Sequence, residues 1–108
     1  MSYTVIEQDL YLKALKKLSK KYKNIESDIE NYLLSIESIE DLGIELKNNV
    51  YKVRIANSDK NKGKSAGYRL ISYVKIMDSE LHLIYIYDKS SLENISEKEL
   101  DILLVKQL

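Results

Sequence analysis

The chain has no cysteine, proline, phenylalanine or tryptophan, and only three glycines and one histidine in 108 residues. Without cysteine there is no disulfide framework and no thiolate metal site, and a lone histidine argues against a metal centre. Without proline, turns must be marked by glycine, asparagine, aspartate and serine. We therefore expect a protein that works with no metal and no cofactor.

The chain also lacks a long apolar run, and its first residues have neither the basic nor the apolar region of a signal peptide. These absences predict a cytoplasmic protein that contacts no membrane. The length suits one compact domain spanning residues 1–108, and the 44% hydrophobic content is enough for one core.

The chain has 17 basic and 17 acidic side chains, so its net charge is zero, but the basic residues are distributed unevenly along the sequence. The window 51–76 contains seven basic residues and one acidic residue, a net of +6, and it holds both arginines of the chain. These basic residues are Lys52, Arg54, Lys60, Lys62, Lys64, Arg69 and Lys75. Such a cluster on an otherwise neutral surface predicts an anionic ligand, of which phosphate is the usual one.

Hydrophobic spacing predicts the element order β-α-α-β-β-β-α. The expected elements are a strand at 3–6, a helix with Asp9 as its N-cap, a helix at 25–36, a connector at 38–49, strands at 51–55, 68–76 and 81–87, and a helix opening at Ser96. This order favours an α+β fold, in which the N-terminal helix pair packs on one face of a mostly antiparallel sheet. We expect the other face to be left for function.

Alternation along the strand at 51–55 separates its side chains into two sets. If Tyr51, Val53 and Ile55 point into the core, Lys52 and Arg54 must project together from the opposite face. Arginine offers a planar fork that matches phosphate oxygens. Ordinary solvated strand charges explain the same pattern, so the sequence leaves both interpretations open.

Two further features lie near this cluster. Alternation in the strand at 81–87 predicts that Leu81, Leu83, Tyr85 and Tyr87 share one side. Gly67 belongs to a polar loop at 57–67, where we expect glycine to let backbone N–H groups approach a phosphate. Tyrosines such as Tyr85 and Tyr87 are more often core residues whose hydroxyl contacts water than catalytic groups.

Three segments in order resemble the RelE/HigB-type toxins of bacterial toxin–antitoxin modules. They read VYKVRI at 50–55, GKSAGYRLI at 63–71 and LIYIYDKSSLENISEKEL at 83–100. The resemblance implies a RelE-like α+β domain with a C-terminal helix, an endoribonuclease that cleaves mRNA on the ribosome without metal, and a cognate antitoxin protein as partner.

The resemblance also implies roles for individual residues. Arg69 would stabilise charge in the transition state, Lys64 or Lys89 would act as the base, and Tyr87 would stack on a base or donate a proton. Lys52, Arg54 and Lys62 would bind RNA phosphates.

Two other functions stay open at this stage. One is a toxin similar to ParE, which acts on DNA gyrase without nuclease activity; the set of strand cations favours the nuclease over it. The other is a non-catalytic RNA-binding module, which the neutral overall charge favours because tight phosphate binding normally comes with excess positive charge.

Overall fold

The computed structural model describes residues 2–60, 66–92, 94–106 and 108. Its regular elements are β1 (Thr4–Glu7), α1 (Asp9–Ser19), α2 (Ile25–Ser35), β2 (Ile44–Lys47), β3 (Val50–Ile55), β4 (Tyr68–Lys75), β5 (Glu80–Asp88) and α3 (Glu97–Lys106). Short 3-10 turns lie at Ile39–Leu42, Ile76–Asp78 and Lys89–Ser91. Among the described residues, no helix is both long and apolar enough to span a membrane.

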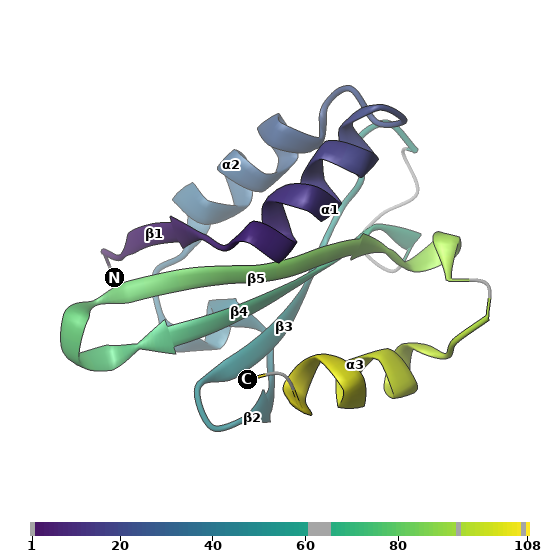
Figure 1. Cartoon of the computed structure of the whole chain (residues 1–108). Helices are drawn as coiled ribbons and strands as arrows, with labels where there is room; N and C mark the ends of the chain where they lie inside the picture. Colours follow the sequence, from purple (N-terminus) through teal and green to yellow (C-terminus); the bar gives the residue numbers. More distant parts are fainter. Residues whose placement is uncertain (1, 61–65, 93, 107) are drawn as a thin grey trace.

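The strands form one sheet of five in the order β1-β5-β4-β3-β2 (Figure 1). β1 runs parallel to β5, and the other neighbouring pairs are antiparallel. The predicted α+β class and the mostly antiparallel sheet are confirmed. The central position of β4 matters for function, because it lies between the two strands that carry the other candidate side chains.

Helices cover both faces of the sheet (Figure 1). α1 and α2 contribute Tyr11, Leu15, Ile25 and Ile29 to the larger core cluster on one face, as expected. α3 packs on the opposite face, where its Leu104 belongs to a second, smaller cluster with side chains of β3, β4 and β5. The face that we expected to be left for function is therefore partly covered by α3, because the apolar side of α3 needs a surface to bury against.

The connector expected at 38–49 contains more structure than predicted. After the 3-10 turn at Ile39–Leu42, β2 pairs with β3 at the edge of the sheet, so the chain has one strand more than the expected order. Ser38 and Asp41 form a reciprocal capping box at the turn. A second, smaller difference concerns α1, whose N-cap is Gln8 rather than Asp9.

A bulge changes which side chains of β5 share a face. The register between β4 and β5 shifts between Ile71 and Ser72. As a result Leu81 and Leu83 belong to the larger cluster under α1 and α2, whereas Tyr85 packs against the smaller cluster on the α3 side. The predicted grouping of Leu81, Leu83, Tyr85 and Tyr87 was wrong because a bulge breaks strict alternation.

Candidate functional site

The candidate site is a row of side chains across three adjacent strands. In the antiparallel register, Arg54 of β3 lies opposite Arg69 of β4, and Arg69 lies opposite Tyr87 of β5. Directly opposed residues project from the same face of a sheet, so the three side chains form one line. Arg54 is exposed, whereas Arg69 is 0% and Tyr87 5% exposed.

Lys52 lies beside this row on β3, two residues before Arg54 and therefore on the same face. Tyr51 and Ile55 belong to the core cluster on the other face, with Val53 packed against it. The predicted alternation of β3 is confirmed. The structure thus brings together four of the seven candidate residues from distant parts of the sequence.

The first turns of α3 place two carboxylates over these cations. The Oε2 atom of Glu97 lies 3.0 Å from Arg69 Nε and 3.4 Å from Lys52 Nζ, and it accepts a hydrogen bond of 3.1 Å from the Tyr87 hydroxyl. Asp101, one turn further along, lies 2.5 Å from Lys52 Nζ through its Oδ2 atom. Glu97 is therefore the point where three predicted site residues converge.

Sequence reasoning missed both carboxylates, although a signal was present. Glu97, Leu100, Asp101 and Leu104 follow the spacing i, i+3, i+4 and i+7, which puts them on one side of a helix. Acidic residues inside an apolar stripe predict a cationic surface beneath that stripe.

The convergence alters the acidity of the groups involved. Burial alone would raise the pKa of Glu97, but Lys52, the Tyr87 hydroxyl and Arg69 together hold it below its ordinary range. Burial and the nearby Glu97 and Asp101 carboxylates raise the pKa of Tyr87 far above that of a free phenol. The Tyr87 hydroxyl therefore keeps its proton and acts as a hydrogen-bond donor.

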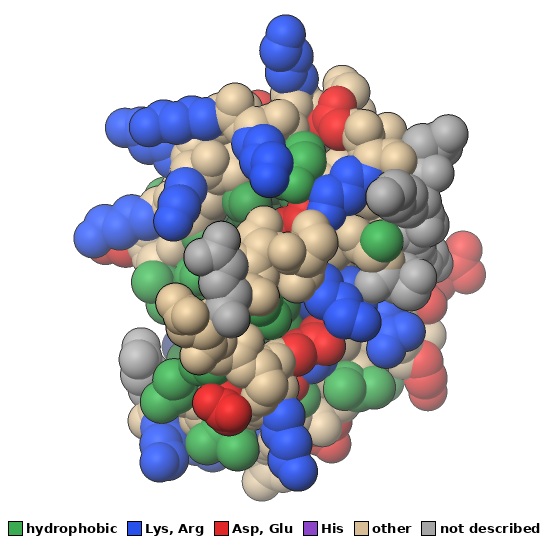
Figure 2. Space-filling model, turned by 90° about the vertical axis from the view of Figure 1, so that its right-hand side faces the viewer, with side chains coloured by type: hydrophobic (Ala, Val, Ile, Leu, Met, Phe, Trp, Pro, Cys, Tyr) green, Lys and Arg blue, Asp and Glu red, His purple; other side chains and the backbone are tan. Residues whose placement is uncertain are grey.

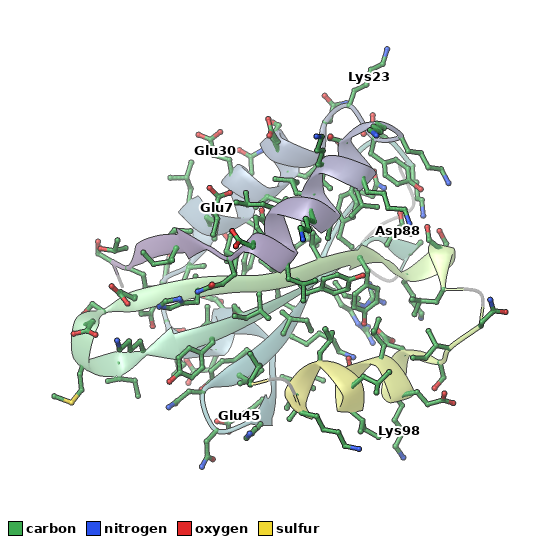
Figure 3. The ribbon with its side chains drawn as sticks, in the orientation of Figure 1. Glu7, Lys23, Glu30, Glu45, Asp88 and Lys98 are labelled. Atoms are coloured by element: carbon green, nitrogen blue, oxygen red, sulfur yellow. The ribbon has the colours of Figure 1, made fainter. Side chains whose placement is uncertain are left out.

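A second polar network fixes the ends of the site strands. Lys60 Nζ lies 2.6 Å from Asp88 Oδ1, and the Asn57 amide donates to Asp88 Oδ2 at 3.3 Å. Burial would raise the pKa of Asp88, but hydrogen bonds from Lys60 and Ser90 outweigh it and keep the pKa below its ordinary value. Lys60, one of the cations counted in the sequence window, thus pairs with Asp88. Asp88 lies at the end of β5 (Figure 3).

Gly67 has a packing role that differs from the one expected. A Cβ atom at this position would lie 2.1 Å from the carbonyl oxygen of Ile55, so glycine is required for the close approach of the chain to β3. Its own carbonyl accepts a hydrogen bond from the Lys89 amide. The expected approach of Gly67 to a phosphate gains no support from this geometry.

The other three candidate residues are Lys89, Lys62 and Lys64. Lys89 lies in the turn after β5 with an exposed side chain. Lys62 and Lys64 lie outside the described residues. Figure 2 shows the side of the molecule that lies on the right in Figure 1. On that side, basic and acidic side chains are interspersed and form no continuous basic surface.

Chemically, the row offers fixed cations and a phenol, with carboxylates already bound to them. The carboxylates of Glu97 and Asp101 contact Arg69 and Lys52, which shows that these side chains suit anionic oxygen atoms. Two arginines directly opposite each other repel, and an anion between them removes that cost.

Comparison with known proteins gives a family and a fold. The profile of the family described as "RelE toxin of RelE / RelB toxin-antitoxin system" matches residues 11–106. No curated protein sequence matches the chain. The isolated E. coli RelE toxin has a similar fold, with a TM-score of 0.55 at 20% identity over 99% of this chain and 100% of the other.

A second structure, an E. coli RelE double mutant in complex with an antitoxin RelBc peptide, matches with a TM-score of 0.53 at 20% identity. It covers 88% of this chain and 99% of that one. These likenesses agree with the fold predicted from the sequence. Because the family profile matches most of its length, the chain belongs to the RelE toxin family of toxin–antitoxin systems.

Proposed function

We propose that this toxin is a metal-independent endoribonuclease that cleaves mRNA on the ribosome and so inhibits translation. The observation that carries the proposal is the row of Arg54, Arg69 and Tyr87 across three strands, with Lys52 beside it. Two arginines and a phenol at fixed spacing suit a phosphodiester that gains negative charge during reaction. Residues 1–108 act as one toxin domain in this proposal, in the cytoplasm.

The reaction follows from the chemistry of RNA. The ribose 2′-oxygen attacks phosphorus, the bond from phosphorus to the 5′-oxygen breaks, and the products are a 2′,3′-cyclic phosphate and a 5′-hydroxyl. Arg69 stabilises the added charge on the phosphoryl oxygens, while Arg54, Lys52 and Lys62 hold neighbouring phosphates.

Proton transfers complete the reaction. Lys64 or Lys89 accepts the proton of the 2′-hydroxyl, and the Tyr87 hydroxyl donates a proton to the leaving 5′-oxygen. The high pKa of Tyr87 is compatible with this role, because an alkoxide leaving group is more basic than a phenolate. No step needs a metal ion.

We also propose that a cognate antitoxin protein binds this toxin. The solved structure of the E. coli RelE double mutant is a complex with an antitoxin RelBc peptide. A toxin that cleaves mRNA must be neutralised in the cell that makes it, so the proposed activity itself calls for such a partner.

The test is a translation extract programmed with a defined mRNA, in which new 5′ ends are mapped by primer extension. Arg54→Ala is the informative variant, because Arg54 is exposed and its loss should leave the fold intact. We expect cleavage by the wild type to fall by on the order of tenfold in Arg54→Ala, and to stay unchanged in the control Lys47→Ala on the edge strand.

Two results would redirect the assignment. Intact mRNA with normal translation would contradict the nuclease assignment. The next experiment would then be a DNA gyrase supercoiling assay, which tests the ParE-like alternative. Salt-dependent RNA binding without any cleaved product would select the non-catalytic RNA-binding module.

A further inference from the structure

A hollow lies where β3 extends beyond β2. β2 pairs with β3 only as far as Lys52, so among the described strands none pairs with the second half of β3 on that side (Figure 1). The hollow has a volume of about 490 Å³, which is within the range of small-molecule sites. It lies between α2, the 3-10 turn at Ile39–Leu42 and β3. Its charged lining residues are Asp28, Glu40, Asp41 and Arg54.

Arg54 belongs both to this hollow and to the cationic face of the sheet, which is formed by Lys52, Arg54 and Arg69. The side chain of Arg54 is exposed, so an RNA phosphate can reach its guanidinium group. The base of that nucleotide can then enter the hollow around the edge of the sheet. None of the described lining residues belongs to α3, so binding here needs no change in that helix.

Two glycines show which way the backbone of Arg54 faces. A Cβ atom on Gly43, just before β2, would meet the carbonyl oxygen of Lys52, so this carbonyl faces β2. A Cβ atom on Gly67, just before β4, would meet the carbonyl oxygen of Ile55, so this carbonyl faces β4. Successive residues of a strand turn their N–H and C=O groups to alternate sides. Arg54 therefore directs one backbone donor and one backbone acceptor toward the free edge of β3.

Asp28 supplies a fixed acceptor on the α2 side of the hollow. The amide and the hydroxyl of Ser58 both donate to its Oδ2 atom at 3.0 Å, and the side chain is half-buried. Both bonds use Oδ2, so Oδ1 is the oxygen that a ligand can use. Asp41 differs, because its Oδ2 atom accepts from the amides of Glu37 and Ser38 at the start of the 3-10 turn.

These groups present one donor and two acceptors, namely the N–H and C=O of Arg54 and the carboxylate of Asp28. The Watson–Crick edge of guanine is complementary, because O6 accepts while N1–H and the N2 amino group donate. Uracil matches the first two groups through O4 and N3–H, but it carries the acceptor O2 in the third place. A carboxylate accepts from the amino group of guanine and repels O2 of uracil.

We propose that this hollow is a base-recognition site, which binds an unpaired guanine of the RNA whose phosphate contacts Arg54. The backbone of Arg54 binds O6 and N1–H, and Asp28 accepts a hydrogen bond from the N2 amino group. This inference rests on the proposed RNA substrate, but it does not depend on cleavage.

The experiment varies one base of the RNA. Four fluorescein-labelled hexanucleotides with 2′-O-methyl riboses contain five uridines and one inner guanosine, inosine, adenosine or uridine. They cannot be cleaved by 2′-attack, and their anisotropy measures binding to the intact toxin at low salt. Inosine differs from guanosine only in lacking the N2 amino group. We expect the guanosine RNA to bind about tenfold more tightly than the inosine RNA, and the uridine RNA to bind no better than the inosine RNA.

Asp28→Asn is the decisive variant, because its amide oxygen can still accept from Ser58 while its NH₂ group takes the place of Oδ1. The preference for guanosine over inosine should fall to less than about twofold. The uridine RNA should bind more tightly than it binds the wild type, because the new NH₂ group donates to O2. The matched control Glu30→Gln removes a charge from the same helix at a different hollow and should keep the full preference.

The outcomes separate this inference from the proposed nuclease. A guanosine preference that depends on Asp28, without cleavage of mRNA by any form, would support the base site and contradict the nuclease. Cleavage of mRNA by a wild type that binds the guanosine and inosine RNAs equally would support the nuclease and overturn the base site. An unchanged guanosine preference in Asp28→Asn, or failure of the wild type to bind any of the four RNAs, would overturn the base site as well.

Discussion

Arg69 and Glu97 form an ion pair in which the guanidinium is completely buried and its Nε atom lies 3.0 Å from the carboxylate. The Nη1 atom of Arg69 also donates to the carbonyls of Gly67 and Tyr68. One side chain on the central strand thus joins the cationic face to α3, so it contributes to stability as well as to the proposed chemistry.

The first prediction concerns stability. Arg69→Met should lower the free energy of unfolding by about 2 kcal/mol, because the partly buried carboxylate of Glu97 loses its ion pair with the Arg69 guanidinium. Urea denaturation followed by circular dichroism measures this loss. The control Arg54→Met removes the same group from the exposed position opposite and should cost less than about 0.5 kcal/mol. Equal losses in the two variants would contradict the structural role of Arg69.

The second prediction concerns the Tyr87 hydroxyl. Tyr87→Phe should lower mRNA cleavage by about a hundredfold if this hydroxyl protonates the leaving oxygen. The free energy of unfolding should fall by only about 1 kcal/mol, the ordinary net contribution of one hydrogen bond. Tyr85→Phe is the control, since Tyr85 lies on the same face of β5 and its ring centroid is 6.1 Å from that of Tyr87. A parallel loss of cleavage in both variants would point to ring packing instead.

The third prediction concerns pH. The folded pKa of Asp88 is held below its ordinary value near 3.8, so the ionised carboxylate stabilises the protein above that value. This stabilisation is lost as the pH falls through the lower, folded pKa. Asp88→Asn should therefore be less stable than the wild type at neutral pH, by about 1 to 3 kcal/mol. The difference should shrink as the pH is lowered below 3.8.

Urea denaturation of both proteins from neutral pH down to strongly acidic buffer measures this difference. Glu30→Gln changes an exposed carboxylate on α2 (Figure 3) and is the control, which should differ from the wild type by less than about 0.5 kcal/mol. A constant gap between the wild type and Asp88→Asn would show that the carboxyl charge is not what stabilises this network.

The fourth prediction concerns Gly43, which precedes β2 with φ of 99°. A Cβ atom there would lie 2.0 Å from the carbonyl oxygen of Lys52, on the strand that carries the site. Gly43→Ala should lower the free energy of unfolding by about 2 kcal/mol or more, from backbone strain and overpacking together. Asn49→Gly, at a non-glycine position with φ of 65°, should be neutral or slightly stabilising in the same assay.

Local pattern was sufficient for most elements of the fold. The spacing of apolar residues located α1 and α2, and the alternation of Tyr51, Val53 and Ile55 placed Lys52 and Arg54 together on the other face, because both signals depend on neighbouring residues alone. β2 was missed although Ile44 and Leu46 alternate with Glu45 and Lys47, because its identity as a strand depends on pairing with β3, which local spacing does not show.

Some residues of the candidate site could also be predicted from the sequence. Arg54, Arg69, Tyr87 and Lys52 were named from charge clustering and from the family resemblance, and the structure brings them to one face. Their roles in cleavage stay predictions. The bulge, at which Ile84 has no partner between the pairs Ile71–Tyr85 and Ser72–Leu83, was not predicted, because every residue from Leu83 to Tyr87 is apolar or aromatic.

The sequence by itself determined most of the helical and extended segments, with β2 as the exception, and which side chains of β3 share a face, because short-range spacing sets both. Only the tertiary structure decided what covers that face. The stripe of Leu100 and Leu104 requires a buried partner for α3 but does not specify which surface that partner offers. Packing across the sheet chose the cationic face, and so placed Glu97 on Arg69.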